Sequence, residues 1–376
     1  MKKILLLPLL DSLPSGHHQV ANTISEYVYN RSNDIKCKKI DIMSRWNPAF
    51  ESMLTKTYLW WIQKNPKSYA RAYRKFVYQP DNQRTYKHYE WMFQRKMKDI
   101  LDDENPDLIV CTHAFPSYLV NRLKRLGECQ IPTLNVYTDF FINDVWGEDM
   151  VDYHFVSNVG MKYSLKNNHH IPNKNIFVTG IPVDESIKQA TLNQRSNDKL
   201  NIIVSGGSAG LGSIMECIRH TNPYKQVNYY ILCGNNERLY KDIRNMKAEH
   251  IHPLPYISSR QKINELYSLA DAIITKPGGV TVSEAVKKRV PIFVHSVLPG
   301  QEEINLAHLL EQGLVFTIDK EAPITEQILE VLNSKEKMDK YKRSQKLYLD
   351  TLDFQDPDDI YHFIISILGS REKKLS

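Results

Sequence analysis

Residues 272–285 read AIITKPGGVTVSEA, and this stretch determines how the second half of the chain is expected to fold. The apolar run AIIT predicts a short buried strand, and the turn Pro277-Gly278-Gly279 leads directly into a helical pattern. Glycines let the backbone come close to a ligand, and a helix that begins at such a turn directs free N–H groups and its positive dipole end at an anion. The stretch therefore predicts a strand, an anion-binding turn and a helix.

The alternation of strands and helices extends over the whole chain. In the second half, strands are expected at residues 200–205, 228–233, 252–256, 272–275, 291–294 and 314–318, with a helix at 261–269. In the first half, strands are expected at residues 3–10, 108–112, 133–137, 153–157 and 175–178, with a helix at 20–29. This order predicts an α/β fold with two Rossmann-like, doubly wound parallel sheets.

A polar stretch, residues 189–199 (QATLNQRSNDK), separates the two series and is expected to be the linker between domains. We therefore expect an N-terminal domain at 1–185, a C-terminal domain at 200–350, and a C-terminal helical segment at 351–376 that can pack on either domain. In this architecture ligands bind at the carboxyl ends of the strands, which places the expected site in a cleft between the domains.

The opening sequence MKKILLLPLL imitates a secretory signal, with two lysines before a short apolar run. The run is short and no small-residue cleavage site follows it, so a buried first strand is the better interpretation. No segment approaches the ~20 apolar residues of a membrane-spanning helix. These features predict a cytoplasmic protein that is soluble or peripheral.

Composition argues against several other classes of protein. The five cysteines are widely spaced and form no C-x-x-C pair, which is typical of reduced thiols. No histidine or cysteine spacing resembles a metal site, and the pair His169-His170 is more typical of a solvated loop. We expect no metal and no cofactor. The net charge of +6 is mildly basic and does not indicate a nucleic-acid-binding protein.

Two glycine-rich turns follow strands in the second half, one at 276–285 and one at 205–212 (SGGSAGLG). Neither matches the P-loop pattern, so kinase or ATPase chemistry is not expected. Taken alone, each turn is also compatible with a tight connection that binds nothing. A nucleotide diphosphate is the natural ligand, and the residues expected to face it are Gly206, Gly207, Lys276, Gly278 and Gly279.

Side chains suited to a nucleotide-sugar follow the second turn. Glu284 lies within the helix after Gly279, where a carboxylate can accept hydrogen bonds from ribose hydroxyls. Gln301 and Glu302 open a later helix and offer amide and carboxylate groups to sugar hydroxyls. Acidic residues are also common at helix starts for electrostatic reasons alone.

Four segments together resemble one enzyme family, the processive diacylglycerol glucosyltransferases and plant monogalactosyldiacylglycerol synthases. They are distant relatives of the enzyme that adds N-acetylglucosamine to the peptidoglycan lipid precursor. Residues 274–313 carry the strongest likeness, and residues 15–21 (SGHHQVA) resemble the family's G-x-G-H loop. Residues 131–140 (IPTLNVYTDF) resemble its P-T-x-x-V-x-T-D-F segment, and residues 179–183 (TGIPV) resemble the end of its first domain.

The resemblance implies a GT-B fold and an inverting transfer that needs no bound metal. The donor is expected to be a UDP-sugar and the acceptor a lipid hydroxyl, most simply that of diacylglycerol. Position 14 is proline where the family loop begins with glycine, and proline cannot adopt a positive φ, so the acceptor is less closely specified than the donor.

By the same resemblance, His17 is the general base or the group that orients the acceptor, next to an acceptor loop at Ser15 and Gly16. Asp139 is the second candidate, either as the base itself or as a carboxylate that orients His17. A helix-capping histidine and a turn-capping aspartate are the structural alternatives. The donor-binding residues implied by the resemblance are Ile257 at the nucleotide base, Thr281, and Gln301, Glu302 and Asn305 at the sugar.

Residues 54–98 have an unusual composition, with eleven Lys or Arg, two acidic residues and eleven aromatic residues. Basic residues attract anionic lipid headgroups, and Trp and Tyr favour the membrane interface. The functional interpretation is peripheral attachment to the inner face of the cell membrane, through a surface that contains Trp60, Trp61, Arg71, Arg74 and Lys75. The alternative is a set of ordinary helices with aromatic cores; single-stranded nucleic acid is a further possibility, although no RNA-binding motif supports it.

Three other functions share parts of this pattern. A glycosyltransferase that uses a soluble or secondary-metabolite acceptor has the same chemistry. The proline at position 14, where the family loop has glycine, is the reason to consider it. A non-catalytic nucleotide-sugar-binding protein is an alternative from another class, and the presence of His17, Asp139 and Glu284 together argues against it. An epimerase of UDP-sugars shares the two-domain architecture. Donor sugar, processivity and oligomeric state are not specified by the sequence.

Overall fold

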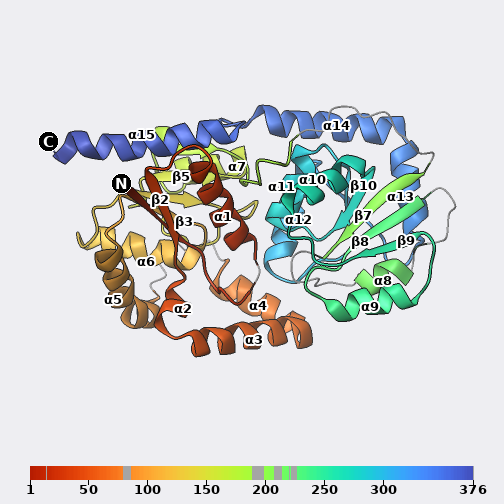
Figure 1. The fold of residues 1–376 in the computed structure, drawn as a ribbon, viewed down its shortest axis with the longest axis horizontal. Coiled ribbons are helices and arrows are strands. Elements are labelled where there is room, and N and C mark those ends of the chain that lie inside the picture. Colours follow the sequence, from red (N-terminus) through yellow and green to blue (C-terminus); the bar gives the residue numbers. More distant parts are fainter. Residues whose placement is uncertain are drawn as a thin grey trace. The chain divides into compact units, whose positions relative to one another are not determined.

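The computed structural model describes residues 1–13, 15–78, 86–188, 199–206, 214–219, 221 and 227–375. The chain forms two compact units, of which the first comprises Met1–Pro182 with Thr351–Ser376 and the second comprises Val183–Asp350. Most of the predicted linker, residues 189–198, lies outside the described residues. Each unit contains one six-stranded sheet (Figure 1).

The sheet of the first unit is entirely parallel and has the strand order β2-β1-β3-β4-β5-β6. Its central strands are short apolar runs buried on both faces, as expected when helices cover a parallel sheet. The strands are β1 (Lys2–Leu7), β2 (Ile35–Lys39), β3 (Leu108–Cys111), β4 (Thr133–Val136), β5 (Tyr153–Val156) and β6 (Ile176–Val178). The helices are α1 (Gly16–Tyr29), α2 (Ile42–Trp46), α3 (Pro48–Lys64), α4 (Pro66–Phe76), α5 (Lys87–Glu104), α6 (Ala114–Arg125), α7 (Val159–Asn167) and α15 (Pro357–Leu375).

The second unit repeats this plan with the strand order β12-β11-β10-β7-β8-β9, again all parallel. Its strands are β7 (Leu200–Ser205), β8 (Val227–Leu232), β9 (Ile251–Leu254), β10 (Ala272–Thr275), β11 (Ile292–Val294) and β12 (Phe316–Thr317). Helices lie on both faces of this sheet (Figure 1): α8 (Ile214–Arg219), α9 (Glu237–Asn245), α10 (Arg260–Leu269), α11 (Gly279–Lys287), α12 (Gln301–Glu311), α13 (Ile324–Asn333) and α14 (Lys335–Asp350).

The predicted α/β class and two parallel sheets are confirmed, and every predicted strand is present with small shifts at its ends. The strand β2 was not predicted. Its sequence, IKCKK, contains three lysines and pairs only with β1 at the edge of the sheet. Edge strands are often rich in lysine because the charge opposes pairing with other chains, and this removes the apolar signal of a strand.

The aromatic and basic segment 54–98 is largely helical, in α3, α4 and α5. Part of its aromatic content is core, since Phe93 is buried and Tyr69 and Tyr73 are nearly so. Other aromatic side chains remain on the surface, with Trp60 61% and Trp91 85% exposed. Among the described residues, no helix combines the length and apolar character that crossing a bilayer requires.

The C-terminal segment, which was expected to pack on either domain, belongs to the first unit. Phe363 of α15 contacts the rings of Tyr153, Phe155 and Phe177 with centroid distances of 5.2, 5.4 and 4.5 Å. Asp353, which precedes α15, adds a second contact, because its carboxylate accepts a hydrogen bond from the Val178 backbone N–H at 2.8 Å. The helix α15 thus packs on the first unit through aromatic side chains on β5 and β6.

Replacing Phe363 with alanine should destabilise the first unit by about 2 kcal/mol, because a large ring is removed from an aromatic cluster. All five tryptophans lie at or before residue 146, so tryptophan fluorescence during urea unfolding reports on the first unit alone. His362→Ala changes an exposed neighbour on the same helix and serves as the matched control. Equal unfolding midpoints for the wild type and Phe363→Ala would contradict the docking of α15.

Candidate functional site

A histidine stands in the first turn of α1, at the carboxyl edge of the first sheet. The helix begins at Gly16, with Ser15 as the N-cap residue, and His17 follows immediately. The Ser15 hydroxyl makes no capping hydrogen bond and has no partner within the described part of the chain. Pro14, the position at which the sequence departs from the family loop, lies outside the described residues.

Two contacts fix the imidazole of His17. Its Nδ1 atom lies 3.0 Å from the backbone oxygen of Thr112 and 2.7 Å from the hydroxyl of Thr138. A carbonyl oxygen can only accept, so the contact with Thr112 requires the hydrogen on Nδ1. In the neutral ring the lone pair is then on Nε2, as a general base requires. The ring of His17 thus contacts residues that follow β3 and β4, and its catalytic role stays a prediction.

Asp139 stands beside this pair, one residue after Thr138 and only 9% exposed. Burial lowers the pKa of His17 below its ordinary value, and the negative charge of Asp139 opposes part of that change. A lowered pKa keeps the ring neutral near pH 7, so it is ready to accept a proton. The structure thus brings together the two predicted catalytic residues, and Asp139 acts on His17 through its charge.

Two further histidines lie nearby and behave differently. The ring of His113 packs edge-on against His17 with a centroid distance of 4.5 Å, and its Nδ1 accepts from the Phe115 backbone N–H at 3.1 Å. Burial holds the pKa of His113 well below its usual range. His18 is buried, with Nε2 3.0 Å from the Leu9 carbonyl oxygen. His113 and Thr138 were not predicted as site residues, although both follow strands that end at this edge.

The helix α4 is attached to the loop that carries Asp139. The Tyr73 hydroxyl is hydrogen-bonded to the Asn143 side chain, and its pKa is raised well above the usual range, first by burial and then by the charge of Asp139. The ring of Tyr78 packs against Phe141 at 5.3 Å. On the same helix, side chains of the predicted membrane-facing surface are exposed: Arg71, Arg74 and Lys75.

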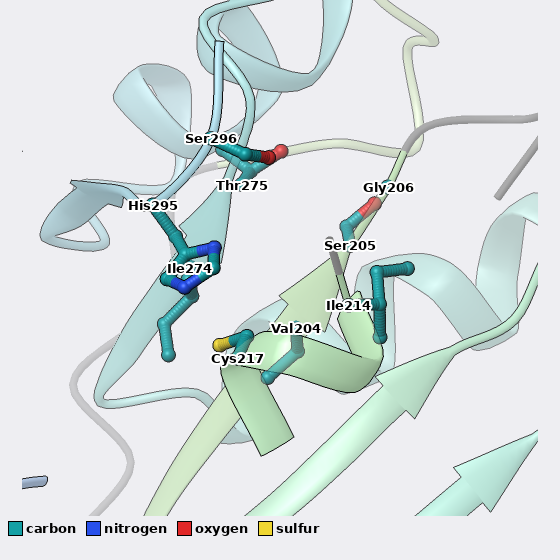
Figure 2. A pocket seen from close by; sticks show the side chains of 9 residues that line it. All are labelled: Val204, Ser205, Gly206, Ile214, Cys217, Ile274, Thr275, His295 and Ser296. Atoms are coloured by element: carbon teal, nitrogen blue, oxygen red, sulfur yellow. The ribbon is translucent and has the colours of Figure 1, made fainter. Parts of the chain in front are cut away.

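The predicted donor residues lie at the carboxyl edge of the second sheet. Figure 2 shows a small hollow there, lined by residues that end or follow the neighbouring strands β7, β10 and β11. Gly206 is among its lining residues, whereas Gly207 lies outside the described part of the chain. The other lining residues are Val204, Ser205, Ile214, Cys217, Ile274, Thr275, His295 and Ser296.

The second glycine turn forms the start of α11 as predicted. Gly278 is the N-cap residue and Gly279 the first helical residue, with Thr281 half-buried in the first turn. A Cβ atom built at Gly278 would meet nothing within 4 Å, so there is open space beside the turn. The backbone N–H groups at the start of a helix can bind an anion there.

Glu284 is buried on the same helix and accepts a hydrogen bond from the Tyr267 hydroxyl at 3.1 Å. Burial raises the pKa of Glu284 to about 7, although the charge of Arg260 opposes the change. Arg260 also forms an ion pair with Asp184 at 3.7 Å. The carboxylate is therefore held in place and is close to its protonation midpoint at neutral pH.

Lys276 and Glu302, which were predicted to face the phosphate and the sugar, form an ion pair with each other. The Nζ of Lys276 donates to Glu302 Oε1 at 2.8 Å, and both side chains are largely buried. Glu302 Oε2 accepts from the Leu298 backbone N–H at 2.7 Å. The predicted phosphate ligand and the predicted sugar ligand thus neutralise each other and fix the loop before α12.

The remaining residues that were predicted to bind the nucleotide-sugar are Gln301, Asn305 and Ile257. Gln301 begins α12 and is half-buried, whereas Asn305, one turn later, is 1% exposed. Ile257 lies half-buried in the loop between β9 and α10. Their contacts with a nucleotide-sugar stay predictions. Among the described residues, no group of three or more His, Cys, Asp or Glu side chains is arranged to hold a metal ion.

Two family models cover almost the whole chain in sequence. Residues 17–183 match monogalactosyldiacylglycerol (MGDG) synthase, and residues 182–347 match glycosyl transferases group 1. The boundary between the two matches coincides with the boundary between the two compact units at residue 182.

Curated proteins and a solved structure are similar over nearly their full length. The uncharacterized glycosyltransferase YkoN of Bacillus subtilis is 38% identical, over 97% of this chain and 98% of that protein. The processive diacylglycerol beta-glucosyltransferase of the same organism is 28% identical over 92% of this chain and 91% of its own length. The crystal structure of MurG from Acinetobacter baumannii has a TM-score of 0.60 at 14% identity, covering 98% of this chain and 100% of that one. The chain belongs to the GT-B glycosyltransferase family that contains the monogalactosyldiacylglycerol synthases and the processive diacylglycerol glucosyltransferases.

Proposed function

We propose that this protein transfers a hexose from a UDP-sugar to a lipid hydroxyl, most simply that of diacylglycerol, with inversion at the anomeric carbon. The observation that carries the proposal is the position of His17, whose Nδ1 lies 3.0 Å from the Thr112 carbonyl oxygen and whose ring feels the charge of Asp139. The proposed substrate class is supported by the relatives of this chain, one of which, at 28% identity, is a processive diacylglycerol beta-glucosyltransferase.

The reaction follows from these groups. Nε2 of His17 takes the proton of the acceptor hydroxyl as that oxygen attacks the anomeric carbon from the face opposite the diphosphate. The bond from the anomeric carbon to the phosphate oxygen breaks, and UDP leaves with the electron pair. The negative charge of Asp139 stabilises the imidazolium that forms. The Ser15 hydroxyl and the Gly16 backbone would guide the acceptor.

The second unit would hold the nucleotide-sugar. The backbone N–H of Gly279 and those of the following residues in the first turn of α11 would bind the diphosphate, so that no resident metal or cofactor is required, whereas the Gly278 N–H donates to the Lys276 carbonyl oxygen at 2.8 Å. Glu284 would accept hydrogen bonds from the ribose through the oxygen atom that Tyr267 does not use. Gly206, Thr281, Gln301 and Ile257 complete the proposed donor site, and Glu302 contributes through its ion pair with Lys276.

Attachment to the inner face of the cell membrane would bring the enzyme to a lipid acceptor. The helices α3 and α4 carry the exposed basic side chains of Arg71, Arg74 and Lys75 together with Trp60 and Trp61, which are 61% and 36% exposed. Basic and aromatic groups of this kind suit an anionic bilayer surface. The helix α4 also carries Tyr73, whose pKa is raised in part by the charge of Asp139.

Incubation of the protein with a panel of UDP-sugars and total membrane lipid, followed by mass spectrometry, tests the function. The expected product is a glycolipid whose mass exceeds that of diacylglycerol by one hexose. Transfer only to soluble acceptors would show that the acceptor is a soluble or secondary metabolite and not a lipid. Binding of a nucleotide-sugar without transfer to any acceptor would indicate a non-catalytic protein.

In the same assay, His17→Ala should lower kcat by roughly 10²- to 10⁴-fold, the usual contribution of a general base. Asp139→Asn should lower it as well, because the imidazolium loses its counter-charge. UDP affinity, measured by calorimetry, should be unchanged in both variants, and the exposed His88→Ala serves as control. Near-normal turnover in both variants would refute the assignment of His17 and Asp139.

Glu284→Ala should weaken uridine and UDP binding severalfold or more. Ribose hydroxyls donate to the ionised carboxylate, and burial raises the pKa of Glu284 to about 7. Uridine affinity of the wild type should therefore rise as the pH increases from about 6 to about 8, and Glu284→Gln should abolish this dependence. Glu265→Gln changes an exposed carboxylate of α10 and controls for general effects. Unchanged uridine affinity in Glu284→Ala would contradict the ribose role.

Joint replacement of Arg71, Arg74 and Lys75 by alanine should reduce binding to vesicles that contain phosphatidylglycerol by tenfold or more. Each basic residue near an anionic surface contributes about 1 kcal/mol. Replacing Lys340, Lys342 and Arg343, which are exposed on α14, removes the same charge elsewhere and is the matched control. Equal co-sedimentation of wild type with neutral and anionic vesicles would exclude an electrostatic membrane surface.

A further inference from the structure

The hollow in the second unit collects residues from the ends of three neighbouring strands. In the register of the sheet, Thr275 lies opposite Val294, and Ile274 lies opposite Val204. The residues that follow these strands therefore leave the sheet at one edge. His295 is the first residue after β11, and it lines the hollow with Ser205 and Thr275 (Figure 2).

Apolar side chains of Val204, Ile214, Cys217 and Ile274 form much of the lining of this hollow, and the polar groups among them can donate hydrogen bonds to an anion. Hydroxyl groups come from Ser205, Thr275 and Ser296, and the backbone of Gly206 completes the polar lining. Of the nine described residues that line the hollow, His295 has the one side chain that can carry a positive charge. It is only 6% exposed, so any hydrogen bond that it donates into the hollow is shielded from water.

Lys276, the cation that the sequence places nearest to the glycine turn, is held by Glu302 at 2.8 Å. Its charge is already balanced by a carboxylate and adds little to the attraction for a second anion. A diphosphate at this edge thus lacks a side-chain cation from the predicted set of residues.

We propose that His295 is the side chain that binds the diphosphate of the nucleotide-sugar, together with the hydroxyls of Thr275 and Ser296. The assignment rests on the proposed function. A ring N–H of His295 would donate to a phosphate oxygen, and the hydroxyls would donate to the same group. The bond between the sugar and the phosphate oxygen leaves its electron pair on the diphosphate as it breaks, so this contact strengthens during transfer.

The test compares the affinities of UDP and uridine by calorimetry, because only UDP carries the group that His295 would bind. His295→Ala should weaken UDP binding roughly tenfold and leave uridine binding unchanged. His295→Gln keeps a neutral N–H donor and should lose less than the alanine variant. His252→Ala is the matched control, since this histidine stacks on Tyr230 at 5.0 Å on the strand β9, away from the hollow.

The outcomes separate this assignment from the broader proposal. If wild type binds both ligands and His295→Ala loses affinity only for UDP, the assignment stands. If His295→Ala binds UDP as tightly as wild type does, His295 is not the diphosphate ligand, although the donor class is retained. If both ligands weaken equally, the side chain supports the fold of the site and the assignment is wrong. If wild type binds neither, the proposed function fails and the inference with it.

Discussion

All strands in both sheets run parallel, and every chemical feature of this protein depends on that constraint. Parallel strands end at one edge, so residues far apart in sequence meet where the strands stop. His17, Thr112 and Thr138 follow three different strands, and two hydrogen bonds of 3.0 and 2.7 Å join them. In the second unit the same rule gathers Gly206, Thr275 and His295 around one hollow. Short apolar strands are thus enough to assemble each group of polar side chains.

Burial then adjusts the acid–base chemistry in opposite directions at the two edges. Removing water disfavours the charged form, so the pKa of His17 falls below its ordinary value while that of Glu284 rises to about 7. A neutral imidazole is what proton abstraction requires. A carboxyl group near its midpoint is less favourable for a ribose contact, and ionisation of Glu284 on nucleotide binding would release a proton. The same physical effect therefore prepares one group and makes the other sensitive to pH.

Local signals in the sequence were sufficient for the sheets and for the ends of strands, because buried parallel strands are continuous apolar runs. They failed at β2, where lysines at the edge hide the strand. They predicted the C-terminal helix but left open the unit on which it packs, because its place depends on Phe363 meeting rings on β5 and β6. The family motifs pointed to His17 and Asp139, whereas Thr138 was not predicted although it lies in a quoted segment, and His113 belongs to no quoted motif. His113 meets the ring of His17, a residue 96 positions away in the sequence, and no local sequence pattern predicts such a contact.

The ion pair between Lys276 and Glu302 shows that residue type alone does not reveal the partner of a buried charge. A lysine before a glycine turn suggests a phosphate ligand, yet a largely buried cation needs a partner when no ligand is bound, and Glu302 supplies it at 2.8 Å. Glu302 also accepts from the Leu298 N–H, and Glu303 accepts from the N–H of Gly300, whose φ of 91° favours glycine. Together these contacts fix the loop between His295 and α12. The charged pair thus holds the loop that follows His295 and Ser296, and the imidazole and hydroxyl groups of the hollow stand beside this loop.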